Sequence, residues 1–422
     1  MSAVAAGAAE ATSLRRARVL GVIFILTGVA IAFFFGAGAD PGADSTLVLN
    51  AARADTFFSM PNLVLPTAGT AYALSAISFA LGGWQLAKGF EKRANLILSL
   101  VALMFVFGFL VWAAEGRSLS LIGMLQSTVL RSVPIAFGAL AGLLCERAGV
   151  VNIAIEGMLL SAAFTSSIAA SLTDNLWVGL LIGAITGAVV AWVLAVLSIR
   201  YLVDHIVAGT VINIFALGIT SYLSSRFLQA DPELNNPGRF QNVQIPVLSD
   251  IPVIGPVLFN HNVFVYLLFV TVAVTYVGLF HTRWGLRVRA VGEHPKAADT
   301  VGIRVLFTRY RNVVLGGLVA GIGGAYFTLG AVGRFEEGMT AGRGFIGLAA
   351  MIFGRWNPVG AFAAALIFGF ADSLQVKLNI LQVGIPSEFL GMAPYLVTIL
   401  IVAGAAHRVR PPAADGKPYV KE

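Results

Sequence analysis

The sequence predicts an all-α polytopic membrane protein with about 12 membrane segments (10–12), some of them discontinuous. Of its 422 residues, 12% are charged and 58% are hydrophobic, whereas an ordinary soluble domain has ~25% charged residues. If each crossing takes about 20 apolar residues, twelve crossings use roughly 240 positions, close to that hydrophobic content. The apolar runs are long and continuous, unlike the alternating ten-residue segments of a transmembrane β-barrel. A soluble enzyme and a barrel are therefore excluded.

Residues 1–117 are predicted to form a three-helix membrane extension. Three arginines precede the apolar residues 19–35, so the positive-inside rule places the N-terminus in the cytoplasm. A small-residue triplet at 37–39 resembles a signal-peptidase site, but the apolar run is longer than that of a signal peptide, which favours an uncleaved anchor. Residues 63–86 are followed by a basic cluster, so they are predicted to cross back to the cytoplasm. Residues 96–113 are predicted to cross outward again.

A second region, residues 118–407, has shorter and more interrupted apolar runs. The polar loop 226–261 carries three acidic residues, Asp231, Glu233 and Asp250, and several prolines, so we expect an external cap. Seven basic residues crowd the loop 281–312, which is therefore predicted to be cytoplasmic. Two arginines place the tail 408–422 on the same side, which fits an even number of crossings. The net charge of +7 thus reflects topology, and we expect no binding to nucleic acid. The apolar runs are 121–144, 150–172, 176–198, 202–223, 263–280, 313–329, 345–353, 359–370 and 391–405.

The sequence offers no resident cofactor, no metal site and no catalytic residues. Cys145 is its single cysteine, which excludes a disulfide framework and Cys-based metal sites. No G-x-x-x-x-G-K-[ST] loop occurs, because the adjacent Gly416 and Lys417 are followed by Pro418 in a polar tail. Any ATP hydrolysis must therefore come from another chain.

The run from Cys145 to Met158 interrupts apolar sequence with an acid, a base, an asparagine and a second acid. An ionised side chain at mid-bilayer costs about 2.5–3.5 kcal/mol, so these residues should face a polar pathway or one another. Together with a glycine they predict a helix broken inside the membrane, as transporters use at substrate sites. The alternative is a short interfacial loop with a structural Glu146–Arg147 pair. The candidate pathway residues in this run are Glu146, Arg147, Asn152 and Glu156.

A second interruption covers residues 342–360, where a short apolar run is bounded by Gly, Arg, Asn and Pro. Interrupted segments in corresponding positions of two halves indicate an internal inverted repeat with a site at its interface. Asn213 lies on a helix deep enough to meet substrate, so we add it to the candidate pathway residues. His205, about two turns earlier, is interpreted as an interfacial hydrogen-bonding residue rather than a proton relay.

The basic loop contains a short helix with a defined start and stop. Pro295 can occupy its first position and Gly302 can end it, which predicts a helix over 295–301. Ala297 and Ala298 would give a small-residue face against which another protein can pack; a solvated connector is the alternative. Elsewhere, successive G-x-x-x-G steps allow close helix packing, and we interpret them as structural. These steps are Gly179, Gly183 and Gly187, with Gly317 and Gly321 in a second helix.

Three of these segments resemble permease subunits of ABC importers. Ala297-Ala298, followed by three residues and Gly302, is similar to the Ala-Ala-x-x-x-Gly core of their coupling loop, although Lys296 replaces the usual leading glutamate. Residues 146–157 and 342–360 resemble the branched-chain amino acid and ribose permease superfamily, and the nucleoside and simple-sugar branch matches best. The resemblance covers about residues 121–407, which makes 118–407 the permease core and 408–422 a cytoplasmic tail.

This resemblance implies a permease subunit of an ATP-driven importer of nucleosides or related sugar-containing solutes, in the bacterial cytoplasmic (inner) membrane with both termini cytoplasmic. It implies four partners: a cytoplasmic ABC ATPase, a second related permease, an extracytoplasmic substrate-binding lipoprotein and membrane lipid. The alternative is an ion-coupled secondary transporter of a polar solute, with Glu156 as its candidate relay. The residues implied in ATPase coupling are Glu293, His294, Pro295, Ala297, Ala298 and Gly302.

Overall fold

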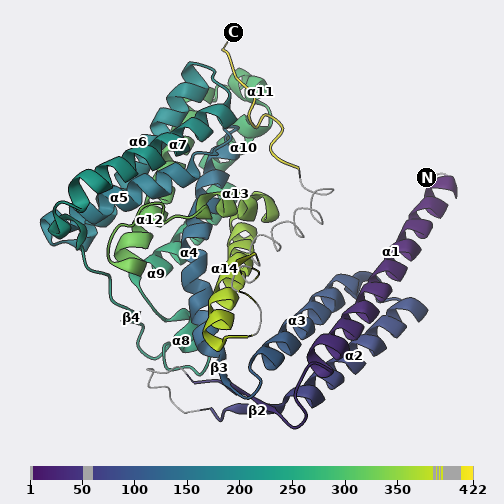
Figure 1. Ribbon diagram of the computed structural model, residues 1–422. Helices are drawn as coiled ribbons and strands as arrows, with labels where there is room; N and C mark the ends of the chain where they lie inside the picture. Colours follow the sequence, from purple (N-terminus) through teal and green to yellow (C-terminus); the bar gives the residue numbers. More distant parts are fainter. Residues whose placement is uncertain are drawn as a thin grey trace. The chain divides into compact units, whose positions relative to one another are not determined.

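The computed structural model (Figure 1) describes residues 3–50, 60–383, 386, 389, 391–392 and 410–421. The chain divides into two compact units. Unit 1 comprises Met1–Gly123 and Lys377–Ile385, and unit 2 comprises Met124–Val376 and Pro386–Glu422.

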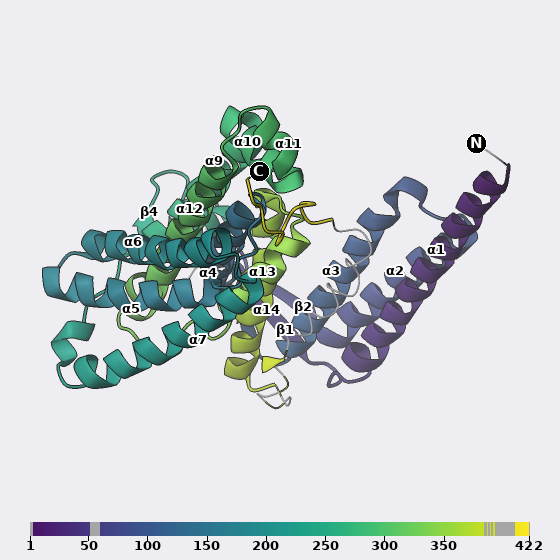
Figure 2. The same ribbon diagram turned by 90° about the horizontal axis from the view of Figure 1, so that it is seen from above.

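Unit 1 contains the three helices that the sequence predicts for its first part. α1 (Ala3–Ala30) continues into the π-helical turn η1 (Ile31–Gly36), and it packs against α2 (Thr67–Ala87) and α3 (Ala94–Ala113). The three lie side by side (Figure 2). A three-stranded sheet, which the sequence did not predict, has the order β2-β1-β3, with β1 antiparallel to β2 and parallel to β3. Its strands are β1 (Asp44–Val48), β2 (Leu63–Pro66) and β3 (Ser118–Ser120), and the 3-10 turn η2 (Glu91–Arg93) precedes α3.

Unit 2 is helical, with a two-stranded pair, β4 and β5, in the predicted external loop. Its long helices are α4 (Leu121–Glu146, whose first turn belongs to unit 1), α5 (Ile155–Thr173), α6 (Leu176–Ala195), α7 (His205–Leu223), α9 (Val263–His281), α12 (Val305–Ala325) and α14 (Pro358–Leu381, whose end belongs to unit 1). Its shorter elements are η3 (Val196–Arg200), η4 (Ser224–Leu228), η5 (Pro232–Asn235), β4 (Val243–Gln244), α8 (Ile254–Leu258), β5 (Asn260–His261), α10 (Arg283–Glu293), α11 (Pro295–Thr300), η6 (Tyr326–Val332) and α13 (Arg343–Phe353).

Within the described residues, nine helices are long and apolar enough to cross a membrane. This confirms an all-α polytopic membrane protein. The helix α2 has 21 residues but falls outside these nine, and most of the predicted run 391–405 lies outside the described residues. The exact number of crossings therefore stays a prediction, as does the inverted repeat. Both predicted interruptions are confirmed, between α4 and α5 and between α13 and α14.

The centre of unit 2 depends on the close approach of α6 and α12. A Cβ added to Gly187 would overlap the carbonyl oxygen of Gly317 and lie 2.6 Å from the backbone nitrogen of Gly321. These are the glycines of the two predicted G-x-x-x-G patterns, so their interpretation as packing positions is confirmed. Because neither backbone has a side chain at the crossing, the helices pack backbone to backbone.

We expect Gly187→Ala to destabilise the folded protein by about 1–3 kcal/mol, since the added methyl group must push α6 and α12 apart. Gly218→Ala in α7 is the matched control, because nothing lies within 4 Å of its added Cβ. Thermal unfolding in detergent measures both variants. Equal midpoints for the two would contradict the packing argument.

Candidate functional site

The first interruption begins where α4 ends at Glu146. Gly149 has a φ of +85°, a left-handed conformation in which glycine commonly terminates a helix. Its N–H donates to the carbonyl of Glu146 (2.9 Å), and Val150 N–H donates to the carbonyl of Cys145 (3.1 Å). The chain then resumes as α5, so Glu146 and Glu156 lie on opposite sides of the break.

The carboxylate of Glu156, in the first turn of α5, holds the start of α13. Its Oε1 accepts from the hydroxyl of Thr340 (2.6 Å) and from Gly342 N–H (2.8 Å), and its Oε2 accepts from Gly344 N–H (2.7 Å). The first N–H groups of a helix have no intrahelical partner and carry partial positive charge. A negative side chain from another helix thus caps α13.

The two helices come so close at this point that Gly344 is required. A Cβ added there would lie 2.6 Å from the backbone nitrogen of Glu156 and 2.7 Å from its Oε2. A larger residue would therefore displace the carboxylate from the helix that it caps.

Glu146 and Arg147, on the N-terminal side of the first interruption, bind the turn that follows the C-terminal end of α13. Trp356, in the turn between α13 and α14, donates from its indole Nε1 to Glu146 Oε2 (2.7 Å). Arg147 donates from Nε (3.0 Å) and Nη2 (2.7 Å) to the carbonyl of Trp356. The turn is left-handed at Arg355 and Trp356, with φ values of +55° and +51°. Among the described residues, the side chains of Glu146 and Arg147 thus both bind Trp356. The alternative prediction was that these two side chains form an ion pair with each other.

The first interruption therefore fixes both ends of α13. Glu156 binds the beginning of this helix, and Glu146 with Arg147 binds the turn that follows it. These contacts are made by Glu156, Glu146 and Arg147, which the sequence singled out, but their partners in the second interruption were not predicted. The sequence Gly342-Arg-Gly344 was the available signal, because glycines around a helix start indicate a close approach.

The remaining polar candidates shape the interruption itself. Asn213 of α7 donates to the carbonyl of Ile153 (2.8 Å) and accepts from Gly157 N–H (2.8 Å). His205 accepts from Val151 N–H through Nδ1 (3.2 Å), which confirms it as a hydrogen-bonding residue. Asn152 is fully buried, with its amide 3.3 Å from the sulfur of Cys145.

Two of the five predicted pathway residues meet at one cavity. It has a volume of about 480 Å³ and is lined by Glu156, Asn213, Thr210, Thr340, Phe345 and neighbouring backbone. Asn152, Glu146 and Arg147 do not line it. The polar groups of Glu156 and Asn213 are already bonded to the chain, so this cavity offers a solute mainly apolar walls.

The predicted short helix in the basic loop is confirmed to within one residue as α11, and Gly302 follows with a φ of +83°. The prediction that Ala297 and Ala298 form one small-residue face for another protein is wrong for Ala298. Ala297 is exposed, but Ala298 is only 3% exposed and packs with Val291, Val305 and Tyr419. Consecutive residues of a helix point about 100° apart and do not share a face. The outward side instead carries Ala297 and Val301, which is 74% exposed.

Residues 410–421 of the C-terminal tail lie against the segment formed by α11 and the end of α10. Ala414 N–H donates to the carbonyl of Gly292 (2.9 Å), and Ala413 N–H donates to the carboxylate of Glu293 (3.2 Å). Arg309 of α12 donates to the carbonyl of Lys417 (3.0 Å). With Tyr419 over Ala298, the tail forms part of the surface around α11. His294, Pro295 and Glu293 share a cavity of about 300 Å³ with tail residues.

Asp415 makes the tail contact sensitive to pH. Burial raises the pKa of Asp415 from 3.8 to about 6, although Glu146, the N–H of Gly416 and Arg309 each favour the opposite direction. The docked tail thus binds this proton more tightly than a free tail does. The contribution of Asp415 to docking is fully present below pH 3.8 and is lost as the pH rises through about 6.

We expect a spin label on Val420→Cys to be more mobile at pH 7.5 than at pH 5, because ionised Asp415 weakens tail docking by up to ~3 kcal/mol. Val420 is 64% exposed and Cys145 is fully buried, so the label reports one position. Adding Asp415→Asn should keep the label immobile at both values of pH. Equal mobility of the label at both values of pH, in the protein that retains Asp415, would contradict this assignment.

The chain is similar to known transport proteins. Residues 124–403 match the family described as "Branched-chain amino acid transport system / permease component". The chain is 38% identical over 307 residues to the guanosine ABC transporter permease protein NupQ of Bacillus subtilis, which covers 71% of this chain and 96% of that protein. The nucleoside ABC transporter permease protein NupC of Lactococcus lactis has the same identity and coverage. The putative glucose ABC transporter permease protein TsgC13 of Haloferax volcanii is 30% identical, over 68% of this chain and 92% of its own.

No solved structure matches the chain. The family match nevertheless covers most of unit 2, including both interruptions and the segment around α11. The chain therefore belongs to the family of permease components of branched-chain amino acid transport systems, and it is a transport subunit rather than an enzyme.

Proposed function

We propose that this permease imports nucleosides across the bacterial cytoplasmic (inner) membrane, driven by ATP hydrolysis on a separate chain. The observation that carries the proposal is the 38% identity to two permeases named for guanosine and nucleosides, along 96% of their length. The interlocked interruptions support it, because broken helices present polar groups within the membrane where alternating access operates.

A continuous set of contacts leads from the coupling segment to the interruptions. In this proposal the ATPase docks on the exposed side of α11, around Ala297 and Val301. The other side of α11 packs on Tyr419 of the tail, and the tail bonds to Gly292 of α10. A Cβ at Gly292 would overlap the carbonyl of Arg147, so α10 rests directly on the first interruption. Movement of α11 would thus reach the residues that hold α13.

The proposal includes further partners and an orientation. A second related permease would complete the pore, an extracytoplasmic lipoprotein would deliver the solute, and membrane lipid would surround the helices. The basic loop and the C-terminal tail would face the cytoplasm together with the N-terminus. Residues 1–117 would serve assembly and orientation, because the interruptions and the coupling segment all lie within 118–407, with 408–422 as the tail.

An ion-coupled secondary transporter is the second candidate, and no observation favours it. Its best relay residue, Glu156, accepts three hydrogen bonds that together fix the start of α13. That arrangement serves a positional role that needs no exchange of protons.

The test uses the permease, its ATPase and its partner permease co-purified and reconstituted in liposomes with the binding protein outside. The proposal expects accumulation of labelled guanosine only with internal ATP. Accumulation driven by a proton or sodium gradient without ATP would overturn it in favour of the second candidate.

We expect Glu156→Ala to reduce uptake at least about tenfold at matched membrane abundance, since it removes all three bonds that position α13. Glu156→Gln should retain part of the uptake. Its amide keeps one acceptor oxygen but turns an NH2 group toward a donor of the α13 start. Wild-type uptake in Glu156→Ala would refute the positional role, and equal failure of both variants with a proton-gradient requirement would favour ion coupling.

We also expect Ala297→Glu to weaken ATPase co-purification several-fold while the permease stays folded, because a charge would then stand on the exposed docking side of α11. Ala298→Glu should act differently, since it forces a carboxylate into the cluster with Tyr419 and destabilises the protein by about 1–3 kcal/mol. Thermal unfolding together with ATPase recovery separates the two effects. Full ATPase recovery with Ala297→Glu would remove α11 as the docking site.

A further inference from the structure

A second cavity, of about 570 Å³, differs in character from the one at Glu156. Its lining includes Arg131, Arg343, Tyr326, Phe327 and Asn262. Ligand sites commonly occupy 300–1,000 Å³ and combine apolar walls with a few placed polar groups. This cavity therefore has the size and the mixed lining of a site for a small planar solute.

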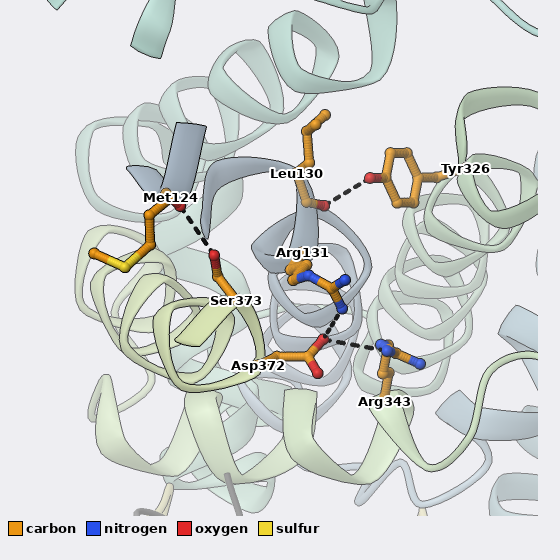
Figure 3. A network of polar contacts seen from close by, with 7 residues as sticks. All are labelled: Met124, Leu130, Arg131, Tyr326, Arg343, Asp372 and Ser373. Atoms are coloured by element: carbon orange, nitrogen blue, oxygen red, sulfur yellow. Dashed lines mark hydrogen bonds and ion pairs between the residues drawn. The ribbon is translucent and has the colours of Figure 1, made fainter. Parts of the chain in front are cut away.

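The two arginines are held side by side by one carboxylate (Figure 3). Asp372 of α14 accepts through Oδ2 from Arg131 Nη1 (2.9 Å) and from Arg343 Nη2 (3.2 Å). Nearby, Tyr326 donates its hydroxyl to the carbonyl of Leu130 (2.7 Å), and Ser373 donates to the carbonyl of Met124 (3.0 Å). Helices α4, α13 and α14 are thus joined where the guanidinium groups lie.

Two guanidinium groups share one carboxylate, so one positive charge is left uncompensated within the group. Each arginine has five N–H donors and no acceptor, and among the described residues each donates to Asp372 through one terminal nitrogen. Within the described part of the chain their side chains are 31% and 24% exposed, so each side chain remains partly accessible. The cavity is rich in donors and suits a ligand with two adjacent acceptors.

The lining also includes acceptors, among them the carboxylate of Glu336 and the amide of Asn262. Asn262 is 2% exposed and donates its amide to the carbonyl of Gly330 (3.0 Å). Its Oδ1 receives no hydrogen bond from the described part of the chain. A ligand that carries a donor beside its acceptors would therefore complete the set.

We propose that this cavity binds the base of a 6-oxopurine nucleoside, with Arg131 and Arg343 as the residues that select it. Guanine presents O6 and N7 as adjacent acceptors, which a guanidinium group binds through two parallel hydrogen bonds. Its ring and amino N–H groups supply the donor for Asn262. Adenine presents an amino donor where guanine has the O6 acceptor. Its amino group would therefore face the N–H donors of the arginines and could not accept a hydrogen bond from them.

The site is connected to the moving parts of the proposed transporter. Arg343 is the first residue of α13, the helix whose two ends are held by the first interruption. A base bound to Arg343 would thus act on the same helix as Glu156. The inference rests on the proposed nucleoside transport and adds to it the residues that choose the base.

The first test varies the ligand and leaves the protein intact. Binding is measured on the purified permease–ATPase complex without the binding protein, which would impose its own selectivity. Guanosine is expected to bind about tenfold more tightly than adenosine and than 7-deazaguanosine, which lacks the N7 acceptor. Equal affinity for the three would overturn the proposal, as would tighter binding of guanosine monophosphate, which would indicate a phosphate site.

The second test exchanges each arginine for lysine, which keeps the charge beside Asp372 but removes the planar fork. Arg131→Lys and Arg343→Lys should each reduce the preference for guanosine over adenosine by about tenfold. Arg226→Lys is the matched control, because Arg226 is exposed and does not line the cavity. Unchanged preference in both cavity variants would overturn the assignment.

The two proposals fail in different ways. If the wild-type complex accumulates nucleosides with ATP but the arginine variants keep its base preference, the cavity assignment is wrong and the transport function stands. If the complex transports no nucleoside yet binds guanosine in the predicted order, the transport function is wrong while the cavity assignment stands.

Discussion

The carboxylate of Glu156 determines where α13 begins, and the neighbouring features of unit 2 depend on that contact. Two backbone N–H groups and one hydroxyl converge on it, so the charge is stabilised by the partial charge of a helix end. At the other end of α13, Glu146 and Arg147 bind Trp356. A short helix of 11 residues is thereby positioned by charged side chains at both ends rather than by its own length.

Much of this architecture could be predicted from the sequence. The breaks at Gly149 and before Pro358 follow from backbone chemistry within a few residues, and the polar residues in an apolar context marked the first interruption as functional. The partners could not be predicted, because the contact between Glu156 and Gly342 joins residues 186 positions apart. The side on which Ala298 lies was also missed, since it depends on packing against Tyr419.

The two cavities differ in whether their polar groups are already bonded within the protein. At the cavity beside Glu156 the polar groups are used to hold the interruptions, which leaves mainly apolar walls. At the other, Asp372 orients two arginines whose further donors remain accessible. Arg131 escaped the sequence analysis because a single arginine within an apolar run gives no indication of its partner. The same isolation in sequence explains why a site built from α4, α13 and α14 appears only in three dimensions.

The position of the tail has a consequence for biosynthesis. Tyr419 covers Ala298, and Ala413 and Ala414 bind the end of α10, yet Ala413 is synthesised 120 residues after Glu293. The surface around α11 therefore reaches its final form only after residue 419 has left the ribosome. A nascent chain that stops before residue 413 would present an incomplete surface there, so assembly with other subunits would discriminate against it.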